Sequence, residues 1–269
     1  MSTRMRDLLG EALAELRYEP TEKRVRAKLG DETALDSTRA LLVWEPRRVV
    51  PTYAVPEADI LAPVTAAPAS DREAGGLLHP GIPFAVHTAA GEPVTIGERV
   101  GAGFRLAELD GAIALDFGAF DAWFEEDERI FGHPRDPYSR VDVRQTARPI
   151  RIEVDGEVVA ETTRARLLYE TQISTRFYLP REDVRVALEP SALRTYCPYK
   201  GEASYWSLDA GGRRYENLAW GYEDPLPDAR PITGLVAFWD ERVDVFVDGE
   251  LRPRPGGEVA DAMQDEFGL

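Results

Sequence analysis

The chain has 269 residues, 43% of them hydrophobic and 9% aromatic, which suffices for one large domain or two small ones and excludes a disordered chain. Its formal net charge of −16 repels phosphate backbones and anionic lipids, so we expect neither nucleic-acid nor membrane binding through a basic patch. The sequence shows no secretion signal and no apolar run of about 20 residues, and a single cysteine fits a reducing compartment, so we expect a cytoplasmic protein.

The first segment of the chain has the spacing of an amphipathic helix. Apolar side chains recur at helical intervals from Met5 to Leu16, and Pro20 ends the pattern. We therefore assign residues 1–20 to an N-terminal helix.

The rest of the chain has the pattern of β-strands. Short runs rich in Val, Ile, Phe, Tyr and Trp alternate with Gly, Asp and Pro. Residues 150–154 read IRIEV, and Asp155-Gly156 then gives the tight turn of a hairpin. Residues 62–83 are rich in Pro, Ala and Gly, and they predict a long loop.

The chain also repeats itself. Residues 24–60 resemble residues 149–184, with the turn in the same place. The matched pairs are Arg26 and Arg151, Arg39 and Arg164, Glu45 and Glu170, Tyr53 and Tyr178, Pro56 and Pro180, and Asp59 and Asp183. A repeat of this length indicates two copies of one β-rich unit.

The repeat sets the predicted domain boundaries. The first β domain spans residues 21–131, an extended connector 132–148, the second β domain 149–252, and a polar, loose tail 253–269.

The second copy carries several motifs that the first lacks or keeps only loosely. They are VDGEVVAET, the run ending in Tyr178 and Pro180, TYCPYKG at residues 195–201, and AWGYEDP at residues 219–225. On these motifs, residues 149–251 resemble a bacterial family of tandem proteins, the domain of unknown function 427. The resemblance implies small, strongly bent antiparallel β domains similar to the β-tent group.

The resemblance does not extend to a metal site or to the chemistry of one family label. Its β-tent relatives hold zinc with paired cysteines, which this chain does not have, so we expect no metal. The family is sometimes labelled nucleotidyltransferase, but no Gly-rich phosphate loop with a lysine and no Gly-Ser followed by paired acidic residues occurs here. The residues imply no particular cofactor.

The TYCPYKG stretch holds the two candidate catalytic residues, Cys197 and Lys200. A cation near a thiol lowers its pKa, and a turn at Pro198 brings the Lys200 amine toward the sulfur. Alternatively, Cys197 is a small buried apolar residue at the entry to a strand. Gly201 after the lysine lets the backbone approach a ligand closely.

The remaining candidates are ligand-binding residues of the second copy. Arg176 falls opposite Pro51 in the repeat, which favours a functional role as an anion clamp with Lys200. The repetition of Tyr178 indicates a role in the fold, and we also include it among the ligand contacts. An aromatic cage would hold a flat or cationic molecule, although such rings equally suit core packing; its members are Tyr199, Trp206, Trp220 and Tyr222.

Three functions remain open from the sequence. The first is a small-molecule-binding domain, with or without catalysis, in which Lys200 and Arg176 fix an anionic group and Trp206, Trp220 and Tyr222 form the pocket wall. The second is a thiol-dependent redox or group-transfer enzyme with Cys197 as nucleophile. The third is a non-catalytic structural or partner-binding module. The sequence indicates no oligomeric state.

Overall fold

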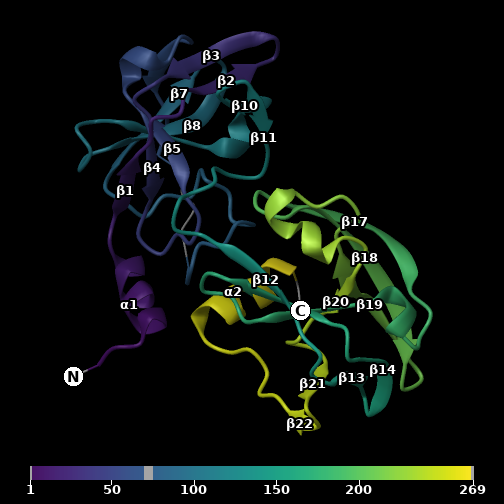
Figure 1. The fold of residues 1–269 in the computed structure, drawn as a ribbon. Helices are drawn as coiled ribbons and strands as arrows, with labels where there is room; N and C mark the ends of the chain where they lie inside the picture. The colour runs from purple at the N-terminus through teal and green to yellow at the C-terminus, as the bar shows by residue number, and fades with distance from the viewer. Residues whose placement is uncertain (1, 70–74, 268–269) are drawn as a thin grey trace. The chain divides into compact units, whose positions relative to one another are not determined.

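A computed structural model describes residues 2–69 and 75–267, and it divides the chain into two compact units, Met1–Asp136 and Pro137–Leu269. Each unit is mainly β and contains one large and one small antiparallel sheet (Figure 1). In the described ranges, no helix has the length and apolarity needed to cross a membrane.

The first unit begins with helix α1 (Met5–Glu11) and a short 3-10 turn, η1 (Ala12–Ala14). In the described residues, its large sheet has the strand order β1-β4-β5-β9-β8-β7-β6 and its small sheet the order β11-β10-β2-β3. The strands are β1 (Arg17–Pro20), β2 (Val25–Leu29), β3 (Glu32–Ser37), β4 (Leu41–Trp44), β5 (Thr52–Val55), β6 (Val64–Ala66), β7 (Gly91–Ile96), β8 (Arg99–Leu106), β9 (Ile113–Leu115), β10 (Ala122–Glu125) and β11 (Glu128–Ile130). Two further 3-10 turns are η2 (Glu57–Asp59) and η3 (Phe117–Ala119).

The second unit repeats this arrangement strand for strand. Its large sheet has the order β12-β15-β16-β20-β19-β18-β17, and its small sheet the order β14-β13-β21-β22. The strands are β12 (Val141–Gln145), β13 (Ile150–Val154), β14 (Glu157–Thr162), β15 (Arg166–Glu170), β16 (Arg176–Leu179), β17 (Glu189–Cys197), β18 (Gly201–Ala210), β19 (Arg213–Gly221), β20 (Val236–Phe238), β21 (Asp244–Val247) and β22 (Glu250–Leu251). The turns η4 (Arg181–Asp183) and η5 (Pro227–Ile232) and helix α2 (Glu258–Phe267) complete it.

The predicted mainly antiparallel β fold with an N-terminal helix is therefore confirmed, and the sequence repeat corresponds to a repeated topology. The hairpin expected after residue 154 is formed by β13 and β14, with Asp155 and Gly156 both at positive φ. Each unit also carries a bulge where the first two strands of its small sheet pair: the extra residue is Ala34 of β3, opposite Ala27/Lys28, and Val159 of β14, opposite Ile152/Glu153. A bulge at the same place in both copies bends the small sheet in the same way, so it is part of the shared fold.

A hydrogen-bonded cluster is also common to both units. It joins η4 to the end of β14 in the second unit and η2 to the end of β3 in the first. Thr162 donates a hydrogen bond from Oγ1 to Asp183 (2.5 Å), and Arg164 pairs with the same carboxylate (2.8 Å). Ser37, Arg39 and Asp59 make the equivalent contacts in the first unit. The sequence matches of Arg39 with Arg164 and of Asp59 with Asp183 are thus confirmed as structural equivalences.

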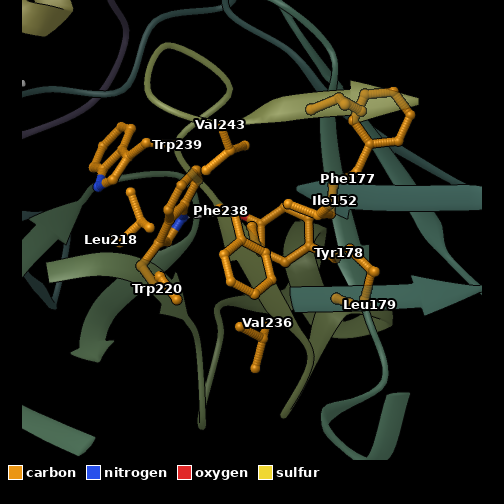
Figure 2. Packing of buried hydrophobic residues seen from close by; sticks show 14 of the residues in the cluster. Ile152, Phe177, Tyr178, Leu179, Leu218, Trp220, Val236, Phe238, Trp239 and Val243 are labelled. Carbon is orange, nitrogen blue, oxygen red and sulfur yellow. Dashed lines mark hydrogen bonds between the residues drawn. The ribbon is translucent and has the colours of Figure 1, made fainter. Parts of the chain in front are cut away.

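The core of the second unit lies between its two sheets. β13 alternates buried and half-buried residues, as a strand with one face on a core does. Ile152 of the small sheet lies in one buried cluster with Phe177, Leu179 and Phe238 of the large sheet (Figure 2). This packing fixes which face of the large sheet is left for other contacts.

Three predicted boundaries differ from the structure. Residues 141–145, placed in the connector, form β12, which pairs with β15 as the equivalent strand β1 pairs with β4. The tail contains helix α2, with Ala260 and Ala262 buried. The N-terminal helix predicted over residues 1–20 is shorter, because residues 17–20 form β1, which pairs with β4. It buries no side chain along α1, so its apolar face remains exposed at Met5 and Leu8.

The loop predicted over residues 62–83 includes strand β6 at its start. Residues 70–74 of that loop, and the last two residues of the tail, lie outside the described residues.

The match of Tyr53 with Tyr178 is wrong by one position. Tyr178 pairs with Ala237 of β20, which pairs with Trp220. In the first unit, the residue in this cross-strand row is Ala54, which pairs with Ala114 and, through it, with Phe104. Tyr53, the neighbour of Ala54, points to the other face of the strand and lies in a different buried cluster. Arg176 consequently corresponds to Thr52, not to Pro51.

Candidate functional site

The TYCPYKG stretch forms the hairpin between β17 and β18. Cys197 pairs with Gly201, and the amide of Lys200 donates to the carbonyl of Cys197 (3.2 Å), which closes a three-residue turn. Gly201 has φ +96, a value that favours glycine, and a Cβ there would lie 3.5 Å from the Asp224 carbonyl. The close backbone approach that we expected for a ligand is therefore made by the chain's own loop after β19.

Lys200 forms an ion pair with Glu170, the last residue of β15. The lysine is 8% exposed, and burial alone would lower its pKa. The nearby Glu170, Cys197 and Tyr178 reverse that effect and raise the pKa of Lys200 above its ordinary value, so the ammonium stays charged. The hairpin thus presents a permanent cation beside a half-buried thiol, Cys197.

Three tyrosines surround this ion pair. Burial raises the pKa of Tyr178, Tyr205 and Tyr222, so all three hydroxyls remain neutral. Tyr178 Oη accepts a hydrogen bond from Trp220 Nε1 (3.2 Å), and Tyr205 Oη lies 2.7 Å from Thr195 Oγ1. Lys200 acts electrostatically on Tyr178 and on Tyr205, and Cys197 acts on Tyr222. The sequence did not single out Glu170 or Thr195 as members of this group.

These side chains share one face of the large sheet. Tyr178, Ala237, Trp220 and Tyr205 are successive cross-strand partners, and directly paired residues point to the same side. We call this side the outer face, because in the first unit the equivalent Ala54 and Phe104 form a cluster apart from the one that holds Val25 and Ala27 of the small sheet. Trp220 and Tyr222 lie two residues apart, so they are directed alike, as the sequence predicted.

Trp206 does not belong to this face. It pairs with Ala219, the neighbour of Trp220, and so points to the opposite side of the sheet. There it lies under Arg181, whose guanidinium carbon is 4.7 Å from the ring centroid. The pocket wall predicted from Trp206, Trp220 and Tyr222 is therefore wrong in its first member.

Arg176 also has a partner other than the one predicted. It is 4% exposed and donates two hydrogen bonds to Glu241, at 2.9 and 2.7 Å. Its guanidinium carbon lies 5.7 Å from the ring centroids of both Trp220 and Trp239. Because Lys200 is held by Glu170, the predicted anion clamp consists of two cations that are already neutralised by carboxylates of the same unit.

Helix α2 covers the part of the outer face around Arg176. Met263 Sδ lies 3.8 Å from an Arg176 nitrogen, and the rings of Phe267 and Trp239 are 4.8 Å apart. Burial raises the pKa of the Glu266 carboxyl to about 7, and Glu266 in turn contributes to the raised pKa of Tyr205. The helix therefore borders the tyrosine cluster, although the sequence placed it in a loose tail.

Two further candidates have a simpler placement. Tyr199 is buried within the hairpin turn, at 7% exposure. In the described part of the chain, His, Cys, Asp and Glu side chains form no group of three that would hold a metal ion.

A family model described as a domain of unknown function, DUF427, matches residues 142–249, from β12 to the turn between β21 and β22. No curated protein matches the chain. The match covers the second unit, so residues 142–249 are similar to the DUF427 family, as the motifs of the second copy predicted.

Proposed function

We propose that the second unit binds a small, uncharged, aromatic or hydroxyl-bearing molecule on its outer face, beside the Lys200–Glu170 pair. The observation that supports this proposal is the convergence of a buried ion pair, a half-buried thiol and three neutral tyrosine hydroxyls at one end of a sheet. Titratable groups with shifted pKa values gather at functional sites more often than elsewhere.

The energetic cost of this cluster argues for a use beyond folding. Removing a lysine and a glutamate from water costs several kcal/mol per ion, and apolar residues of similar volume would serve a core as well. The first unit adopts the same topology without a lysine at this place, because its equivalent glutamate is held by other partners. The fold therefore forms without a lysine at this position, so folding alone does not explain the presence of Lys200 in the second unit.

The charge balance indicates the chemistry of the ligand. An anion would compete with Glu170 for Lys200 and with Glu241 for Arg176, at a face where the acidic Asp240 also lies. A neutral molecule keeps both ion pairs and uses the tyrosine hydroxyls as donors and acceptors. We accordingly replace the anionic ligand expected from the sequence by an uncharged one, in a cytosolic protein whose thiol stays reduced.

Native mass spectrometry of freshly purified protein tests the proposal. We expect a co-purified molecule, or saturable binding of benzamide as a probe. The double variant Lys200→Met and Glu170→Gln, which leaves no unpaired charge, should lose the bound mass. Arg181→Met removes a cation from the opposite side of the same sheet and should keep it. Binding that survives the double variant, or no binding by any of these measures, contradicts the proposal.

A second candidate function is thiol chemistry at Cys197. It is favoured by the electrostatic interaction of Cys197 with the Lys200 ammonium, since a cation stabilises a thiolate. Iodoacetamide alkylation of the folded protein, followed across pH, tests this function. Lys200→Met combined with Glu170→Gln, which removes the charged pair beside the thiol, should change the alkylation rate several-fold. A thiol that reacts only after unfolding, in either protein, excludes a nucleophilic role.

A further inference from the structure

The first unit contains a different charged pair at the place where the second has Lys200 and Glu170. Glu45 directly follows β4, as Glu170 ends β15, and it is 1% exposed. Its Oε1 lies 2.8 Å from His87 Nδ1, and its Oε2 accepts hydrogen bonds from the amides of Thr88 (2.7 Å) and Ala89 (3.0 Å). The partner of the glutamate comes from equivalent segments of the two units. His87 lies just before β7, and Lys200 lies just before the equivalent strand β18.

These contacts fix the carboxylate in its charged form. Burial alone would raise the pKa of Glu45, but the hydrogen bond and charge of His87, together with the two amides, lower it below its usual value. A charged carboxylate beside Nδ1 stabilises a proton on that nitrogen and leaves Nε2 as the variable position of the ring. Glu45 is thus placed to orient the imidazole.

The position of the His87 ring is also fixed. It stacks on Phe104 with a centroid distance of 3.9 Å and an interplanar angle of 13°. Phe104 belongs to an apolar cluster on the outer face of the first unit's large sheet, with Val43, Ala54 and Leu106. One ring face and Nδ1 are therefore occupied, and the edge that carries Nε2 is left for another molecule.

Nε2 reaches solvent. It makes no hydrogen bond to any described residue, and the His87 side chain is 11% exposed. In the described ranges, the fully buried side-chain nitrogen and oxygen atoms without a partner belong to Arg26, Arg48, Arg151 and Asn217, not to His87. A carboxylate, an imidazole held at Nδ1 and an accessible Nε2 are the parts of a general acid–base pair.

We propose that Glu45 and His87 form a second binding site of the protein, in the first unit, which takes a small neutral molecule bearing an acidic hydroxyl, such as a phenol or an enol. The hydroxyl donates its hydrogen bond to Nε2, and the apolar cluster around Phe104 lies beside the carbon skeleton. Transfer of the proton would break the O–H bond, form the Nε2–H bond and leave an imidazolium paired with Glu45. Lys200 cannot play this part in the second unit, because its ammonium has no lone pair to offer.

His87→Asn separates a binding role from a structural one. The asparagine amide can donate to Glu45 from nearly the place of Nδ1, so the loop stays tied to β4, but nothing replaces Nε2. The probes are diethyl pyrocarbonate, which acylates accessible neutral imidazoles, and phenol, followed through the imidazole nitrogen resonances. His133→Gln is the matched control, because His133 is 6% exposed and lies in the same unit.

In the wild-type protein, we expect diethyl pyrocarbonate to modify His87 at least about tenfold faster than His79 and His133, and phenol to shift the His87 Nε2 resonance and slow its acylation. His87→Asn should keep the melting temperature and lose the phenol-induced shifts of the amide resonances around Phe104, while His133→Gln keeps both. An unreactive His87 in the folded protein, a phenol titration that leaves its resonance in place, or phenol-induced shifts around Phe104 retained in His87→Asn would each overturn the proposal. Because these readouts lie in the first unit, they are independent of Lys200 and Glu170.

Discussion

Arg176 and Glu241 form a bidentate ion pair inside the second unit, with nitrogen–oxygen distances of 2.9 and 2.7 Å and both residues buried. The first unit has Thr52 at the position of Arg176, and that hydroxyl donates instead to the Leu115 carbonyl (2.5 Å). The same topology is thus completed by an ion pair in one copy and by a hydroxyl in the other.

Removing one member of this pair should be far more harmful than removing both. Glu241→Gln leaves a buried guanidinium without its carboxylate, and we expect a loss of about 3–5 kcal/mol in the free energy of unfolding. Arg176→Met combined with Glu241→Leu should cost much less than the sum of the single variants. Urea unfolding, monitored by hydrogen exchange at second-unit amides, measures both. Additive costs would mean that the pair is not coupled.

The second unit should lose stability as pH rises toward neutrality. Burial raises the pKa of Asp240 to about 7, with Glu241 adding to the shift, so the folded state keeps a proton that the unfolded chain releases near pH 4. Because the folded state binds more protons over this window, the free energy of unfolding falls between about pH 4 and pH 7. Asp240→Asn should flatten the decline, measured by urea unfolding at several pH values. An equally steep decline in that variant would contradict this assignment.

Trp220 and Trp206 lie on opposite sides of the large sheet, so replacing them should affect Cys197 differently. Trp220→Phe removes the hydrogen-bond donor to Tyr178, the tyrosine next to Lys200, and should change the alkylation rate of Cys197 several-fold. Trp206→Phe removes a ring of the same kind on the opposite side, so it should leave that rate unchanged, although both variants lose stability. Equal effects on the thiol would contradict the assignment of faces.

Helix α2 should depend on its aromatic contact. Phe267→Ala removes the ring that stacks near Trp239, so we expect a red shift in tryptophan emission and a loss of about 1–3 kcal/mol. Phe131→Ala is the control, because that ring is 44% exposed in the first unit. An unchanged emission spectrum in Phe267→Ala would show that α2 does not rest on Trp239 in solution.

The repeat and the hairpin turns made the fold predictable from sequence, because both depend on local patterns. β12 was missed because its sequence does not resemble that of β1. Only its pairing with β15 identifies it as the first strand of the second unit. Helix α2 was missed because its four acidic residues obscure the few apolar ones that dock it. Contacts with a distant sheet, which local composition does not encode, decide both elements.

The candidate site was predictable in part. Lys200, Tyr178, Trp220 and Tyr222 do lie together, but a one-residue slip in register exchanged the faces of Tyr53 and Tyr178 in the comparison of the copies. The carboxylate partners were not predictable, because Glu170 and Glu241 are 30 and 65 residues away from the cations they bind. His87 was missed for the same reason, since it meets Glu45 only across a long loop.

The pairing of β2 with β10 and of β13 with β21 joins the beginning of each unit to its end. During synthesis from the N-terminus, β2 therefore waits for almost the whole unit to leave the ribosome before its partner arrives. By the time β13 emerges, β10 is already available to β2, and each early strand finds the late strand of its own copy first. Order of appearance thus protects two copies of one topology from exchanging strands, the characteristic misfolding route of tandem domains.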